Sequence, residues 1–194
     1  MTPFSTTNEG ESDLIQRARA GEEAAWETLV REHQESVFRL AYLFLSDPDE
    51  AEDVAQETFL RAQQRLERFD TRRMLRPWLL SIAANLARNR RRSISRYLNA
   101  LQRLARSESG IQKKIEEQSV LALEAQRLWS AVRQLGTTDQ QVIYLRYFLE
   151  MPVEETALAM HSAPGTVKSR LNRALKRLRS VIEQEYPDLM EPPV

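Results

Sequence analysis

The chain has 194 residues, of which 28 are basic and 28 acidic, so its formal net charge is zero. The absence of cysteine excludes disulfides and thiolate metal sites and indicates a reducing compartment. Five glycines and abundant Ala, Leu, Glu, Arg and Gln predict an all-α protein. The N-terminus has no signal-peptide pattern, and no apolar run approaches the ~18 residues that span a bilayer, so we expect a soluble intracellular protein.

Four helices are predicted in the first half of the chain from capping residues and apolar spacing. The stretch "SDPDE" at 46–50 supplies an N-cap and a first-turn proline for the third of them, and "DTRRMLRP" at 70–77 is typical of a loop. The predicted helices run from Ser12 to Gly21, from about 22 to 45, from 46–50 to Phe69, and from Pro77 to about Arg92.

A second, smaller helical domain is predicted after a linker. Residues 93–120 contain the break "SESG" between helix-forming flanks, which favours a partly helical linker. Three further helical stretches follow: one from Val120 to Gly136, one capped near Thr138, and a short helix, tight turn and longer helix over 153–182. We therefore expect two small helical domains at 1–95 and 122–186, a linker at 96–121 and a tail at 187–194.

The neutral total hides two blocks without any acid. Residues 71–106 contain ten arginines and residues 161–180 contain six basic residues, whereas residues 1–70 contain 16 acidic and 7 basic residues. Solvated surfaces usually mix both signs of charge, so these blocks indicate contact with a polyanion at two places.

The second block contains "GTVKSRLNRALKRLR" at 165–179. At about 100° per residue, its apolar side chains form one stripe and its polar and cationic side chains project from the other side. With the preceding short helix and turn, this is the pattern of a helix-turn-helix whose second helix enters a major groove, where Arg, Lys and Asn contact bases. The alternative is a surface helix with solvated charges. The apolar stripe comprises Val167, Leu171, Ala174, Leu175 and Leu178.

Two stretches carry a resemblance to a known family. Residues 137–179, "TTDQQVIYLRYFLEMPVEETALAMHSAPGTVKSRLNRALKRLR", resemble the C-terminal promoter-binding region of the sigma-70 family of RNA polymerase sigma factors. "DPDEAEDVAQETFLRA" at 47–62 and "SIAANLARNRRR" at 81–92 resemble the other conserved region of that family. The length and two-domain layout are similar to the extracytoplasmic-function (ECF) subfamily, and the likeness covers residues 12–95 and 122–183.

The resemblance implies a protein that binds core RNA polymerase, recognises the −35 and −10 promoter elements and promotes opening of the DNA. Three sets of residues are implied by matching the family pattern. The −35 contacts are Thr166, Lys168, Ser169, Arg170, Asn172 and Arg173; the −10 contacts are Phe69, Ile82, Asn85, Arg88, Arg90, Arg91 and Arg92; the polymerase contacts are Asp53, Gln56 and Glu57.

The residues themselves support these roles in part. A polar stripe is predicted along the fourth helix. Binding of an unstacked base needs an apolar or aromatic wall beside hydrogen-bond donors, and the residues present fit this requirement. Phe69 fits core packing as well as it fits a role in the pocket wall, and Trp78 fits core packing better. Acids at the start of the third helix are also explained by their favourable interaction with its dipole. A positive φ at His161, in the turn, would cost stability. The polar stripe comprises Ser81, Asn85, Arg88, Asn89 and Arg92.

Three other classes of protein fit the sequence less well. An enzyme is disfavoured because only two histidines are present, no two glycines lie within ten residues, and no Gly-x-Ser-x-Gly or Ser-x-x-Lys occurs. An autonomous dimeric helix-turn-helix regulator needs no acidic docking surface. A sigma mimic that sequesters an anti-sigma factor needs neither Asn85 nor acid-free basic faces.

The resemblance also implies partners and a place in the cell. These are the clamp and flap regions of core RNA polymerase, promoter DNA and an anti-sigma factor that covers both domains. We expect a bacterial cytoplasmic protein, held at the membrane when its anti-sigma factor is anchored there, with no direct membrane insertion and with no metal or cofactor.

Overall fold

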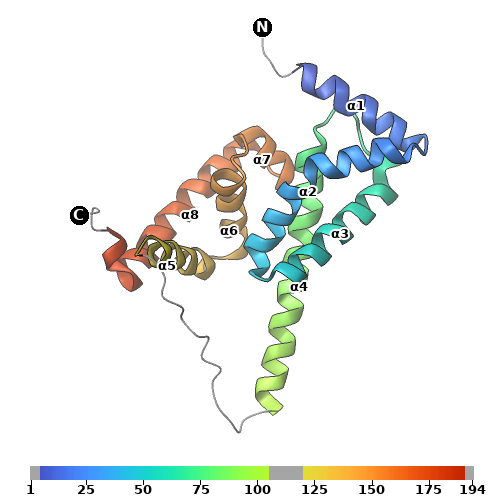
Figure 1. Cartoon of the computed structure of the whole chain (residues 1–194). Helices are drawn as coiled ribbons and strands as arrows, with labels where there is room; N and C mark the ends of the chain where they lie inside the picture. Colours follow the sequence, from blue (N-terminus) through green and yellow to red (C-terminus); the bar gives the residue numbers. More distant parts are fainter. Residues whose placement is uncertain (1–4, 105–119, 191–194) are drawn as a thin grey trace.

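The computed structural model describes residues 5–104 and 120–190, and every regular element in these ranges is helical. The all-α fold class is therefore confirmed. Two groups of helices lie against one another, with α1–α4 in one and α5–α8 in the other (Figure 1). The helices are α1 (Ser5–Arg19), α2 (Glu23–Leu45), α3 (Pro48–Arg65), α4 (Leu75–Leu104), α5 (Val120–Gln134), α6 (Thr137–Ile143), α7 (Val153–Ala159) and α8 (Pro164–Glu185).

The junction between α2 and α3 follows the capping signals in the sequence. Ser46 ends α2 in the left-handed region at φ 58° and its N–H donates to the Tyr42 carbonyl. The Asp47 carboxylate accepts from the N–H of Glu50 at 3.0 Å, and Pro48 occupies the first turn, where no N–H donor is needed. The predicted start of the third helix is confirmed.

Other predicted boundaries are wrong. Helix α1 begins at Ser5 rather than at Ser12, and α3 ends at Arg65, followed by the 3₁₀ turn η1 (Leu66–Arg68), so that Phe69 lies outside the helix. Helix α4 begins two residues before Pro77 and continues to Leu104, because arginine, leucine and alanine favour helix propagation. The stretch "SESG" lies outside the described residues.

The second group of helices turns twice through left-handed residues. A π-helical turn, η2 (Tyr144–Phe148), follows α6, and Glu150 at φ 54° redirects the chain into α7. His161 at φ 48° then redirects it into α8, so the positive φ considered at this residue is present. The short η3 (Pro187–Met190) follows α8.

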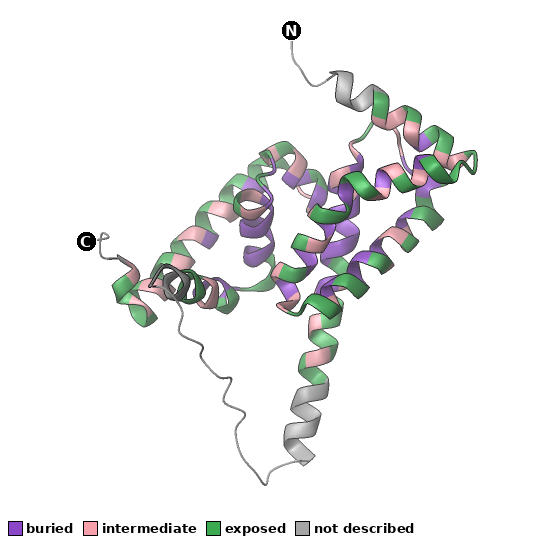
Figure 2. Ribbon diagram, in the orientation of Figure 1, coloured by how far each residue is buried: buried purple, intermediate pink, exposed green. Residues whose placement is uncertain are grey.

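The apolar core is continuous between the two groups of helices. Figure 2 shows buried residues along the facing sides of both groups. Phe44 of α2 packs edge to face on Tyr144 of η2, with ring centroids 5.1 Å apart. Arg39 and Arg76 extend this contact by donating to the carbonyls of Phe148 and Leu149, each at 3.0 Å. The structure is thus a closed arrangement in which the two groups share one core.

Among the described residues, none of the helices combines the length and hydropathy that crossing a bilayer requires.

Candidate nucleic-acid interfaces and acidic docking face

Helix α8 has one buried face and one exposed cationic face. Val167 and Ala174 are buried, and the three leucines of the predicted stripe are partly buried, which confirms the predicted apolar side. Among the residues implied for −35 contact, only Arg170 is half-buried. The exposed ones are Thr166, Lys168, Ser169, Asn172 and Arg173.

Cations at the start of α8 have no acidic partner in residues 5–104 and 120–190. The Arg173 Nε donates to the Ser169 carbonyl at 3.3 Å, a contact within the helix. Farther along, Arg177 pairs with Asp139 of α6 and Arg179 pairs with Glu183 at 2.8 Å. The cationic face that α8 leaves for a ligand therefore lies toward its N-terminal half.

A tight turn joins α7 to α8. The N–H of His161 donates to the Leu158 carbonyl at 3.1 Å, and the N–H of Ser162 donates to the Ala157 carbonyl at 2.9 Å. Helix α8 then begins at Pro164. Together these elements form the predicted helix-turn-helix frame.

Helix α4 carries the second implied nucleic-acid site. Asn85 is exposed, whereas Ile82 is buried and faces inward. Phe69 is also buried, with its ring centroid 4.7 Å from that of Trp78. The exposed Asn85 amide thus lies on α4, whereas the two apolar residues implied for −10 contact are buried, Phe69 before this helix and Ile82 within it.

The prediction was wrong for one residue of the polar stripe. Ser81 is buried, and its hydroxyl donates to the Trp78 carbonyl at 2.7 Å. A serine satisfies its hydrogen bond within the helix in this way and tolerates burial. The exposed polar side of α4 therefore begins at Asn85.

Two arginines of α4 contact the other group of helices. Arg88 donates to the Asn85 side-chain oxygen and, through Nη1, to the Gln141 side-chain oxygen at 2.9 Å. Arg91 donates to the Gln140 side-chain oxygen at 2.6 Å. Burial lowers the pKa of Arg88, and the positive charge of Arg92 lowers it further. Sequence reasoning missed the two glutamines, because only packing brings α6 against α4.

A pocket of about 620 Å³ lies between the start of α4 and the α7–α8 turn. Phe69, Asp70 and Trp78 line one side, and Leu158 and His161 line the other. The wall implied for −10 recognition is therefore faced by the helix-turn-helix in this closed arrangement.

The acidic face lies on α3 beside α4. Asp53 and Gln56 are exposed and Glu57 is half-buried, so the three implied polymerase contacts share one surface. A groove of about 560 Å³ runs beside them and includes Leu60, which is 55% exposed and was missed from the sequence because it lies off the apolar stripe. The groove also includes Arg90.

Basic side chains partly neutralise this face. Arg90 pairs with Glu50 and, through Nη2, with Asp53 at 3.2 Å. The hydrogen bond to Glu50 and the negative charge of Glu50 raise the pKa of Arg90. Arg61 pairs with Glu57 at 2.6 Å. Arg90, implied for DNA contact, is thus directed at α3, whereas Arg92 is exposed on α4.

Comparison with protein families gives two matches in the chain. Residues 29–97 match the sigma-70 region 2 family, and residues 125–178 match the sigma-70 region 4 family.

Curated relatives match most of the length of this chain. The ECF RNA polymerase sigma factor SigL of Mycobacterium tuberculosis is 34% identical over 88% of this chain and 96% of its own length. SigW of Bacillus subtilis, also an ECF sigma factor, is 30% identical over 85% of this chain and 92% of its own length. BldN of Streptomyces coelicolor is 29% identical over 89% of this chain, and the match spans 66% of BldN.

Solved structures share the fold. The structure of CnrH in complex with the cytosolic domain of CnrY has a TM-score of 0.68 and 24% identity, covering 90% of this chain and 98% of that one. The sigma factor RpoE of Bartonella quintana, in complex with the anti-sigma factor NepR, has a TM-score of 0.57 and 23% identity, covering 82% and 97%. From its two matched regions and its relatives, this chain belongs to the ECF sigma factors of the sigma-70 family, which bind RNA polymerase and recognise promoters in transcription initiation.

Proposed function

We propose that this chain binds core RNA polymerase, recognises −35 and −10 promoter elements through α8 and α4, and promotes opening of the duplex, without catalysing a reaction of its own. The observation that carries the proposal is the exposed face of α8 over residues 164–180, which is cationic and free of acids while the opposite face of the helix is held in the core. The proposed units are region 2 at 1–95, a linker at 96–121, and region 4 at 122–186, followed by the tail.

The −35 element is read by α8 in this proposal. Asn172 and Arg173 project from the same exposed side and suit adenine and guanine edges in a major groove. Thr166 and Arg170 lie near the helix start, where phosphate contacts are favoured. Lys168 and Ser169 complete the contact surface.

The −10 element is read by α4 and the segment before it. Asn85 accepts and donates hydrogen bonds to a base taken out of the stack, and Phe69 with Ile82 supplies the apolar wall. Arg88, Arg91 and Arg92 neutralise the strand, and Arg90 joins them when it leaves its acidic partners. Capture of an unpaired strand favours the melted state, so opening needs no ATP.

Two of these cations are engaged in the closed arrangement. Arg88 and Arg91 bond to the glutamines of α6, and the α7–α8 turn faces the base-binding wall. Promoter binding therefore requires the two groups of helices to separate, and polymerase binding supplies the energy. We expect the chain alone to bind promoter DNA weakly.

Polymerase binds through the acidic face in this proposal. Asp53, Gln56 and Glu57 contact the clamp, with Leu60 as an apolar contact beside them. The second group of helices contacts the flap.

An anti-sigma factor is the proposed regulator. CnrH and RpoE, which share the fold, were each solved with a bound partner, CnrY and the anti-sigma factor NepR respectively. Because polymerase and promoter DNA are in the bacterial cytoplasm, we place the chain there, held at the membrane when its anti-sigma factor is anchored.

Permanganate footprinting on a promoter found by start-site mapping tests this proposal. Core polymerase with this chain should expose unpaired thymines near the start site, and core polymerase alone should not. A footprint that needs no polymerase would instead indicate an autonomous regulator.

Arg173→Ala should weaken promoter binding by about 1–3 kcal/mol and relax the preference at one −35 position. Arg179→Ala is the matched control, because Arg179 is paired with Glu183 on the same helix.

A further inference from the structure

Helix α1 contacts both ends of the segment that joins α3 to α4, residues 66–75. Glu11, Ile15 and Arg19 follow one another at intervals of four residues, so they lie along one side of α1. Ile15 is fully buried and anchors this side against the core. The two charged residues that flank it bond to backbone groups of the segment.

Arg19 holds the start of the segment. Its Nε donates to the Leu66 carbonyl at 2.9 Å, and its Nη2 donates to the Phe69 carbonyl. Because the guanidinium is a planar fork of donors, it constrains two carbonyls at once, which a lysine ammonium does less well. The backbone on either side of η1 is thereby tied to α1.

Glu11 holds the end of the segment. Its Oε2 accepts from the N–H of Leu75, the first residue of α4, at 3.0 Å. Its Oε1 lies 3.2 Å from Nε2 of His33 on α2. A carboxylate at a helix N-terminus satisfies an N–H group that has no partner within the helix. The start of α4 is thus fixed relative to α1 and α2.

The segment held in this way carries the wall of the proposed −10 site. Phe69 lies between the two tethered ends, and its ring packs on Trp78 in the first turns of α4. Helix α1 (Ser5–Arg19) precedes residues 29–97, which match region 2. We propose that Arg19 and Glu11 are positioning residues, which shape the wall against which a −10 base stacks and so contribute to −10 sequence preference. This inference rests on the proposed −10 role of Phe69 and Asn85.

The test is in vitro transcription with core polymerase and the full chain on two promoter libraries, one randomised at −10 and one at −35. For Arg19→Ala we expect the preference among −10 sequences to fall about five-fold, the scale of one lost base contact. Preference among −35 sequences and co-purification with core polymerase should not change.

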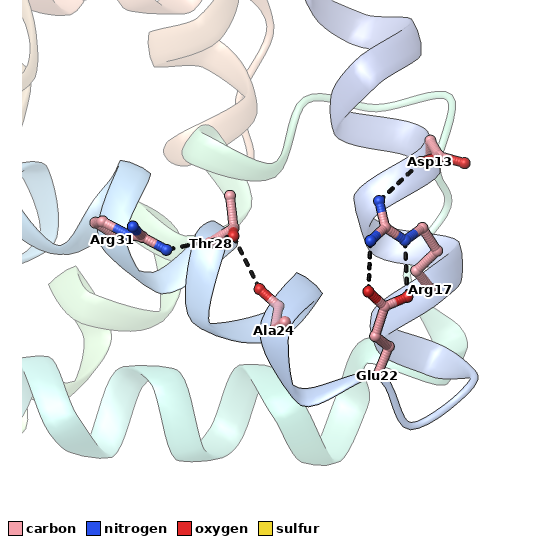
Figure 3. A network of polar contacts seen from close by, with 6 residues as sticks. All are labelled: Asp13, Arg17, Glu22, Ala24, Thr28 and Arg31. Carbon is pink, nitrogen blue, oxygen red and sulfur yellow. Dashed lines mark hydrogen bonds and ion pairs between the residues drawn. The ribbon is translucent and has the colours of Figure 1, made fainter.

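Arg17→Ala is the matched control on the same helix. The Arg17 side chain lies beside Asp13 and Glu22 at the exposed α1–α2 turn, with Nε 2.7 Å from Glu22 Oε2 (Figure 3). This variant should keep both preferences. If Arg19→Ala lowers transcription equally from all −10 sequences, or behaves as Arg17→Ala does, the inference is overturned.

A second variant covers the case in which Arg19→Ala unfolds. Arg19→Lys keeps the charge but offers its N–H donors from a single nitrogen, so it should fold and show a smaller loss of −10 preference. An unchanged preference overturns the inference. Asn85→Ala separates the two proposals. If Asn85→Ala changes −10 preference and the Arg19 variants do not, only the positioning role fails. If Asn85→Ala also leaves the preference unchanged, the proposed −10 site itself fails.

Discussion

Glu155, in the first turn of α7, is a half-buried carboxylate beside the contact between the two groups of helices. Burial raises the pKa of Glu155; the positive charge of Arg76 opposes this rise, and the negative charge of Glu11 adds to it. The ionised form is therefore less favourable in the folded chain than in the unfolded chain.

This shift has a definite sign for stability. Because the folded state holds the Glu155 proton more tightly, the free energy of unfolding falls as pH rises from the ordinary glutamate pKa through the raised one. Glu155→Gln should therefore unfold at a higher temperature than the natural chain at about pH 7, and the difference should vanish at about pH 4. Thermal unfolding followed by circular dichroism at both pH values measures this.

The neighbouring glutamate provides the control. Glu154 lies in the same first turn but is exposed, so Glu154→Gln should not gain stability at neutral pH. Equal gains for the two variants would mean that the loss of any negative charge from this turn, rather than burial of Glu155, is responsible.

At the scale of elements, α3 and α4 share a charged seam. Arg90 of α4 pairs with Glu50 and Asp53 of α3, beside the groove that includes exposed Leu60. These are surface pairs, which contribute about 0–1 kcal/mol to stability each, so their main effect is on the charge presented to a partner.

Reversal of one charge tests the docking role of this seam. Asp53→Arg should abolish co-purification with core polymerase, because it places a cation in the proposed contact and opposes Arg90. Asp49→Arg makes the same reversal in the first turn of α3, away from the groove, where lost dipole interaction costs about 0.3–1 kcal/mol. Asp49→Arg should still co-purify. Retention of Asp53→Arg would place the polymerase contact elsewhere.

At the scale of the whole molecule, the contacts that keep the structure closed oppose the proposed binding of promoter DNA. The shared core and the arginine contacts to Gln140, Gln141, Phe148 and Leu149 hold the groups together. The proposed function requires Arg88, Arg91 and the base-binding wall to reach DNA. Closure and promoter binding therefore compete for the same side chains.

Gln141 offers a way to change closure without changing a proposed DNA contact. Gln141→Lys places a cation against Arg88 and should open the chain, whereas Gln141→Glu provides a carboxylate for Arg88 and should keep it closed. The chain has no cysteine, so single cysteines at the exposed Gln63 and Gln184 allow spin labels whose separation is measured by pulsed electron resonance. We expect the labels to be farther apart in Gln141→Lys than in Gln141→Glu. In the natural chain, we expect them to be farther apart after core polymerase is added than before.

Binding of single-stranded −10 DNA without polymerase gives an independent measurement. Gln141→Lys should bind more tightly than Gln141→Glu if closure masks α4. Equal separations and equal affinities would show that the arginine–glutamine contacts do not control opening. Circular dichroism of both variants shows whether α6 has kept its helix.

The sequence by itself determined that the chain is helical, most of the inward faces of the helices, and two blocks of residues without acids. Residues three and four apart meet on one side of a helix, so the stripe of α8 and the exposure of Asn85 follow from local geometry. The cap at Asp47 and the turn at His161 are likewise local.

Only the tertiary structure decided which distant side chains meet. Arg88 contacts Gln141, which is 53 residues away in the chain, and Arg90 contacts Asp53, which is 37 residues away. Arg19 contacts the carbonyls of Leu66 and Phe69, which are 47 and 50 residues away. Periodicity specifies the direction of a side chain around its own helix, but not which other helix packs there. The partner is set by how both groups of helices bury their apolar faces in one core, and this packing places the proposed promoter contacts against the glutamines of α6.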